Sequence, residues 1–160
     1  MGMAKTWVFF IFNQIWRYAR IFKALEVAEK NQIVETRVAL IRKHSENIIL
    51  MKFKNNVLVT LEDAKEIDAS ISQTFPGDFY YIIDALDLTS NMSTRGLSYF
   101  SKHSVISKKT LAAAIVLNNL PVRLTASAFV NFYKPSFIAK IFKNHKEAEN
   151  WIDQLSFKAV

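Results

Sequence analysis

Residues 80–97 read Tyr-Tyr-Ile-Ile-Asp-Ala-Leu-Asp-Leu-Thr-Ser-Asn-Met-Ser-Thr-Arg-Gly-Leu, and this stretch decides the fold. Its apolar first part predicts a strand that is buried on both faces and ends at Asp84. A loop rich in hydroxyl side chains follows, and a helical pattern begins at Ser93 or Thr94. In α/β proteins, ligands and partners usually meet the fold at the carboxyl end of such a strand. We therefore expect the functional site here.

The sequence before this strand predicts a β-meander followed by a helix. Residues 34–40 alternate as a half-buried strand does, 48–54 indicate a second strand, and 57–59 a short third strand after an Asn-Asn turn. Thr60 is expected to cap the next helix. Three acidic residues are expected to keep the outer face of that helix charged: Glu62, Glu66 and Asp68.

The sequence after the central strand alternates between helices and strands. A helix is expected to end near His103, a buried strand to span 110–117, and a strand nearer the sheet edge to span 137–142. A final helix begins after Asn144. Between the two strands, a helix begins at Pro121, and four residues are expected to line its inner face: Leu124, Ala128, Phe129 and Phe132.

These elements predict an α/β fold. Its mixed β-sheet has about five to six strands, a β-meander and then βαβ units, with helices on both sides of the sheet. An amphipathic helix within residues 1–32 precedes a domain formed by residues 33–160.

Composition restricts the chemistry. The chain has 160 residues, which suits one domain with a real core, and it has no cysteine. Thiol catalysis, thiolate metal sites and disulfides are therefore excluded. Its three histidines are far apart in the sequence, so we expect neither a metal site nor a cofactor.

The net charge of +7 is unevenly distributed along the chain. Residues 1–32 have five basic and two acidic side chains (+3), 33–94 have six and nine (−3), and 95–160 have ten and three (+7). A basic carboxyl-terminal half favours an anionic partner or simply keeps the protein soluble. The lysines that alternate with aromatic residues there are expected to lie outside a packed core, and nucleic acid is not an expected partner.

The amino-terminal segment leaves several possibilities open. Its apolar run, 7–12, is too short to cross a bilayer and makes a poor secretory signal. From Trp16 the pattern is amphipathic. The segment either packs on the domain or on a second subunit, lies in a membrane interface, or is upstream sequence outside the fold. The candidate contact residues are Trp7, Phe10, Ile11, Trp16 and Phe22.

Residues 56–66, 81–85, 139–142 and 147–152 together resemble a group of small bacterial proteins described as STAS-like, after sulfate transporters and anti-sigma-factor antagonists. The resemblance covers about Val34 to Leu155 and implies a STAS-like domain without an established activity. STAS-like folds are also related in architecture to lipid-transfer domains, which implies that an apolar ligand is an alternative.

The resemblance also implies a regulatory site. In anti-sigma-factor antagonists, a serine in an Asp-Ser-Ser/Thr-Gly-Leu motif at the helix start is phosphorylated by a partner kinase. Ser93 and Thr94 match the hydroxyl positions of that motif. Met92 stands in place of its aspartate, and Arg95 adds one residue before the glycine.

No motif for catalysis accompanies this region. The chain has neither a Gly-x-Ser-x-Gly elbow nor a glycine-rich phosphate loop, so we do not expect an enzyme. Asp84 is expected to turn the chain, and Ser93 or Thr94 either caps the next helix or accepts a phosphate.

We therefore expect a cytoplasmic binding or regulatory domain that recognises a protein partner or a second copy of itself. The expected contact residues are Asp84, Thr89, Ser90, Ser93 and Thr94. The alternative is a carrier of lipid or of a small apolar ligand. Its amino-terminal helix would attach it to the inner membrane surface.

Overall fold

The computed structural model describes residues 19–20, 23, 32–88 and 92–158. The chain divides into two compact units, residues 1–32 and 33–160, and the second contains the sheet. Its elements are β1 (Ile33–Glu35), β2 (Ala39–Ser45), β3 (Ile48–Phe53), α2 (Leu61–Thr74), β4 (Phe79–Asp84), α3 (Thr94–Lys102), α4 (Val105–Lys109), β5 (Thr110–Val116), α5 (Leu120–Ala128), η1 (Phe129–Tyr133), β6 (Ile138–Phe142) and α6 (His145–Lys158).

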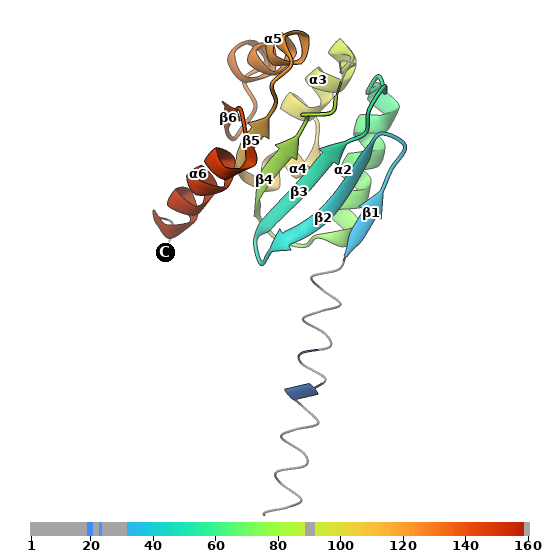
Figure 1. The fold of residues 1–160 in the computed structure, drawn as a ribbon. Coiled ribbons are helices and arrows are strands. Elements are labelled where there is room, and N and C mark those ends of the chain that lie inside the picture. Colours follow the sequence, from blue (N-terminus) through green and yellow to red (C-terminus); the bar gives the residue numbers. More distant parts are fainter. Residues whose placement is uncertain (1–18, 21–22, 24–31, 89–91, 159–160) are drawn as a thin grey trace, which may run out of the picture. The chain divides into compact units, whose positions relative to one another are not determined.

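The described strands form one sheet in the order β1-β2-β3-β4-β5-β6, which is also their order in the chain (Figure 1). β1, β2 and β3 pair antiparallel, whereas β3, β4, β5 and β6 pair parallel. The prediction of a mixed α/β sheet with a meander followed by βαβ units is confirmed.

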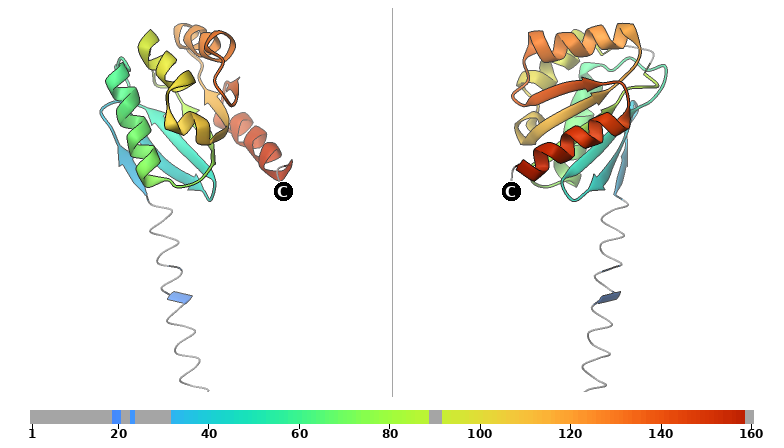
Figure 2. Two further views of the ribbon diagram at one scale, coloured as in Figure 1. Left: turned by 180° about the vertical axis from the view of Figure 1, so that it is seen from behind. Right: turned by 60° about the vertical axis from the view of Figure 1, so that its left-hand side comes forward.

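Helices cover the two faces of the sheet unequally (Figures 1 and 2). Each parallel strand is added on the same side of the previous one, and right-handed crossovers then place all connecting helices on one face. α2, α3, α4 and α5 pack on that face, in a core that includes Ile67, Leu97 and Val122. α6 packs on the other face, where Ala148 and Ile152 contact a second cluster.

The prediction of a third strand at 57–59 is wrong. The meander is completed upstream instead, because the expected first strand is divided into β1 and β2. Asn56 does turn the chain with a positive φ of 55°, but the chain then leaves the sheet. Val59 makes only an isolated bridge to Met92, since Thr60 must cap α2 immediately afterwards.

The start of α2 has the predicted cap, and its outer face differs from the prediction. Thr60 and Asp63 form a reciprocal capping box. Asp68, which was expected on the acidic outer face, is buried. Within the described residues, no helix is long and apolar enough to cross a membrane.

Candidate functional site

Asp84 ends β4 at the position that the sequence predicts, and its side chain holds the chain in a turn. One carboxylate oxygen accepts a hydrogen bond from the Leu86 N–H at 3.0 Å. The other lies 3.0 Å from Nε2 of His145, the first residue of α6. The expectation that Asp84 turns the chain is confirmed, and the histidine adds a contact to α6 that the sequence did not predict.

An open groove of about 340 Å³ borders this pair on the α6 side of the sheet. Its walls carry both signs of charge and two histidines; they are formed by Leu40, Arg42, His44, Leu50, Lys52, Asp84, His145 and Glu149.

Four hydroxyl residues after Asp84 were expected to form the contact surface, and the structure describes two of them. Thr89 and Ser90 lie outside the described residues. Ser93 is the N-cap of α3, and its Oγ accepts a hydrogen bond from the Gly96 N–H at 3.1 Å. Thr94 is the first residue of that helix and is exposed. The capping prediction is therefore confirmed for Ser93, and Thr94 has the more accessible side chain.

Glycine at position 96 allows the start of α3 to lie close to the start of α2. A Cβ on Gly96 would lie 3.1 Å from Cγ of Met92 and 3.3 Å from the carbonyl oxygen of Thr60. The backbone N–H of Ser93 also donates to the carbonyl of Val59 at 2.9 Å. The two helix starts are thus fastened together by backbone contacts.

An ion pair supports the start of α2 from the other side. Nε of Arg37 donates to Oδ1 of Asp63 at 2.8 Å, and Nη2 of the same guanidinium donates to Oδ2. The backbone N–H of Thr60 also donates to this carboxylate at 2.8 Å. The Arg37 hydrogen bond is the main cause that lowers the pKa of Asp63 from 3.8 to about 2.

Asp68 fastens α2 to the segment between α3 and β5. Its buried carboxylate accepts hydrogen bonds from the Tyr99 hydroxyl at 2.8 Å and the Ser104 hydroxyl at 2.7 Å. It also accepts from the backbone N–H groups of Val105 at 3.0 Å and Ile106 at 2.8 Å, at the start of α4. This side chain is structural, and its partners could not be predicted from the sequence because they lie 31 to 38 residues away.

The outer face of α5 and η1 is apolar, which contradicts the predicted inner face of this helix. Leu120, Leu124 and Phe132 are 68%, 65% and 81% exposed, and Ala128 between them is exposed too. Of the expected inner residues, only Phe129 is buried. We call Leu120, Leu124, Ala128 and Phe132 the α5 stripe.

The helix has a second apolar face, and that face packs inward. Val122, Ala126, Phe129 and Tyr133 recur at intervals of four, three and four residues and contact the core. Both faces therefore fit a helical period, and the sequence alone could not tell which one is buried. The last turn is a π-helix, in which the Lys134 N–H bonds the carbonyl of Phe129 at 3.2 Å.

The described charged residues within and directly after α5 and η1 are positive. Arg123 lies within α5 next to Leu124, and Lys134 follows η1 two residues after Phe132; both are exposed. The described residues of α5 and η1 contain no acidic side chain. The surface therefore combines exposed apolar side chains with basic neighbours.

The chain belongs to the family described as Domain of unknown function (DUF7793), whose model matches residues 40–156. No curated protein matches the chain.

Among solved structures, the chain is similar to an uncharacterized protein of the DUF3478 family from Shewanella loihica PV-4, which has a SpoIIAA-like fold. The identity is 17%, the match covers 74% of this chain and 98% of the other, and the TM-score is 0.50. This likeness confirms the STAS-like, SpoIIAA-like fold expected from the sequence and extends no further than the fold.

Proposed function

We propose that this member of the DUF7793 family is a binding domain without catalytic activity, and that it recognises a protein partner through the α5 stripe. The observation that carries the proposal is the exposure of Leu120, Leu124 and Phe132 along one helix face. Large apolar side chains that gather on one surface are characteristic of interaction sites, whereas single exposed ones are ordinary.

The basic neighbours of the stripe favour a partner with an acidic rim. Arg123 and Lys134 would meet acidic side chains around the apolar contact and would direct the approach of the partner. Two copies of this chain that met stripe to stripe would bring like charges together. A different protein, with an apolar groove and acidic edges, therefore fits this surface better than a second copy.

The start of α3 is a second candidate contact. Thr94 is exposed at the amino end of the helix, where a phosphate is electrostatically favoured. Ser93 uses its Oγ as the helix cap, so a phosphate there would have to replace that hydrogen bond. We therefore place regulation at Thr94 rather than at Ser93.

We retain the cytoplasm as the proposed location. The alternative position at the inner membrane surface depends on Trp7, Phe10, Ile11, Trp16 and Phe22, which lie outside the described residues. Liposome flotation of the full chain, with and without residues 1–30, tests that alternative.

The test of protein binding compares matched surface variants. The full chain, the variant Leu124→Ser/Phe132→Ser and the control Leu58→Ser are used to recover partners from cells of the source organism. Leu58 is 54% exposed and lies outside α5, so it controls for the loss of an exposed leucine. A protein recovered by the wild type and the control, but not by the stripe variant, is then purified and tested for direct binding. Equal recovery by all three proteins would contradict the proposal.

A further inference from the structure

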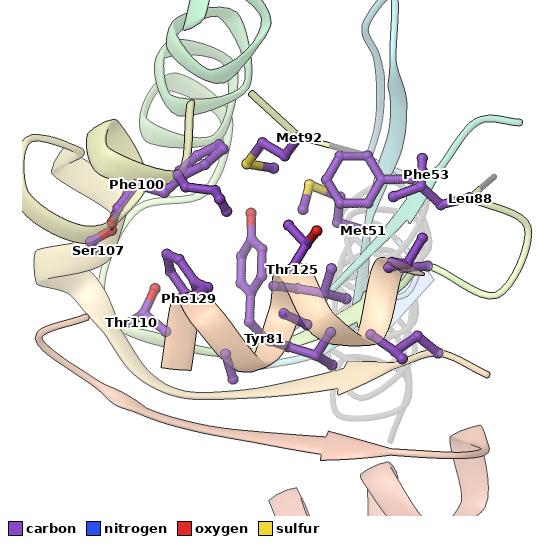
Figure 3. A pocket seen from close by; sticks show the side chains of 18 of the residues that line it. Met51, Phe53, Tyr81, Leu88, Met92, Phe100, Ser107, Thr110, Thr125 and Phe129 are labelled. Atoms are coloured by element: carbon purple, nitrogen blue, oxygen red, sulfur yellow. Dashed lines mark hydrogen bonds between the residues drawn. The ribbon is translucent and has the colours of Figure 1, made fainter. Parts of the chain in front are cut away.

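A cavity of about 110 Å³ lies between the sheet and the helices on its more heavily covered face (Figure 3). The sheet contributes Met51 and Tyr81 to its lining, α3 contributes Phe100, and α5 and η1 contribute Thr125 and Phe129. Apolar cavities of roughly 150 Å³ stay dry and bind benzene. The cavity of this protein is somewhat smaller, so a ligand can be at most about the size of benzene, which has six heavy atoms.

The Tyr81 hydroxyl is buried and faces this space. The residue is 3% exposed, and Figure 3 shows its ring rising from β4 with the hydroxyl directed into the pocket. Among the described residues, the hydroxyl has no hydrogen-bond partner. Buried polar groups in folded proteins are nearly always paired, so an unpaired donor directed into a cavity indicates that a partner is missing.

The other polar side chains of the lining are already paired. The Ser107 hydroxyl donates to the carbonyl of Phe100, and the Thr110 hydroxyl to that of Ile106 at 2.8 Å. The Thr125 hydroxyl donates to the carbonyl of Pro121 at 3.3 Å. The Tyr81 hydroxyl is therefore the donor that remains available to a ligand among the described lining residues.

The charge of the lining restricts the ligand further. None of the described residues that line the cavity is charged, so an ionic ligand would lose its hydration without compensation. Burial raises the pKa of the Tyr81 hydroxyl, which keeps it protonated and able to donate. Met51 and Met92 are flexible thioethers in the wall and can adapt to ligands of slightly different shape.

We propose that this cavity is a binding site for a small, neutral, mainly apolar molecule with one hydrogen-bond acceptor, and that Tyr81 donates a hydrogen bond to that acceptor. The ligand is a ring or short chain with a carbonyl, ether or hydroxyl oxygen. The site is separate from the α5 stripe, because the stripe occupies the outer face of the helix whose inner face lines the cavity.

The test uses two isosteric probes of six heavy atoms, cyclopentanone and methylenecyclopentane, which differ in the presence of an acceptor oxygen. The full chain is labelled with ¹³C in its methionine methyl groups, and each probe is titrated while the signals of Met51 and Met92 are followed by NMR. The variants are Tyr81→Phe and the control Tyr80→Phe. Tyr80 is the preceding residue, and it packs in the cluster on the opposite face of the sheet.

We expect both probes to shift the Met51 and Met92 signals of the wild type. Tyr81→Phe should weaken the binding of cyclopentanone about tenfold relative to that of methylenecyclopentane, which is the effect of one lost hydrogen bond. Tyr80→Phe should leave that ratio unchanged. Comparing the ratio removes the different hydration of the two probes from the result.

Three results would overturn the inference. If neither probe shifts the methionine signals of the folded wild type, the cavity is not a ligand site. If both probes bind but their ratio is the same in Tyr81→Phe and wild type, Tyr81 does not recognise the ligand. A filling variant, Ala126→Leu, should abolish the binding of both probes, and undiminished binding would place them elsewhere.

Discussion

The hydroxyl of Tyr99 in α3 donates a 2.8 Å hydrogen bond to the carboxylate of Asp68 in α2. Burial and this hydrogen bond raise the pKa of Tyr99 to about 12. Since the same carboxylate accepts from the Ser104 hydroxyl and from two backbone N–H groups of α4, Asp68 fixes the positions of three helices. These helices pack on the face that contains the cavity.

Replacing either Asp68 or Tyr99 should therefore destabilise the domain, and the loss should be larger for Asp68. Asp68→Asn replaces an acceptor oxygen with an amide that faces donors, and we expect a loss of about 2 to 4 kcal/mol in the free energy of unfolding. Tyr99→Phe should cost about 1 to 2 kcal/mol. Urea denaturation measures both losses, and Asp153→Asn, at an exposed position of α6, is the control. Equal effects of the Asp68 and Asp153 variants would show that the network does not stabilise the fold.

The ion pair between Arg37 and Asp63 should make the stability of the domain depend on pH in the acid range. The pKa of Asp63 is about 2 in the folded domain, below its ordinary value of 3.8, so the unfolded chain binds the proton first as the pH falls. The resulting stabilisation is complete above about pH 4 and is lost as the pH falls through 2.

Arg37→Met should remove most of this effect. Wild type and variant are compared by chemical denaturation between pH 7 and pH 2, and their difference in unfolding free energy should shrink below pH 4. Arg42→Met serves as the control for a lost arginine, because Arg42 is an exposed residue of β2. A difference between Arg37→Met and wild type that stays constant down to pH 2 would rule out this coupling.

The two hydroxyl residues at the start of α3 should respond differently to alanine. Ser93→Ala removes the helix cap and should cost about 1 kcal/mol of stability, whereas Thr94→Ala should change stability by less than about 0.5 kcal/mol. If Thr94 contacts the partner, Thr94→Ala weakens partner recovery without destabilising the domain. Unchanged recovery would restrict the contact to the α5 stripe.

The order of strands and helices was largely readable from the sequence, because caps and apolar periods are local. Thr60 and Asn144 were recognisable as helix caps, and the short apolar run that ends at Asp84 indicated a buried strand. The prediction of a strand at 57–59 was wrong because Val59 pairs only with Met92, which is far away in the sequence.

The surface chemistry was harder to predict for the same reason. Residues 120–133 carry two apolar faces with nearly equal periods, and the choice between them depends on how the helix packs on the sheet. Tyr81 looked like any other residue of a buried strand. Only the packing of the helices above it leaves its hydroxyl without a partner.

The α5 stripe should be dispensable for folding, since its side chains are exposed. The free energy of unfolding of the variant Leu124→Ser/Phe132→Ser should lie within about 0.5 kcal/mol of the wild-type value. Urea denaturation checks this before any binding experiment. A large loss of stability would mean that the stripe is packed in the native protein, and the control Leu58→Ser would then show whether serine itself is harmful.

The most direct test of the proposed function is a calorimetric titration of the purified partner into the full chain. If the stripe is the contact surface, Leu124→Ser/Phe132→Ser raises the dissociation constant at least a hundredfold, because two central apolar contacts are lost. Leu58→Ser changes it less than about twofold. A dissociation constant that is the same for the stripe variant and the wild type would contradict the proposal that this domain binds its partner through α5.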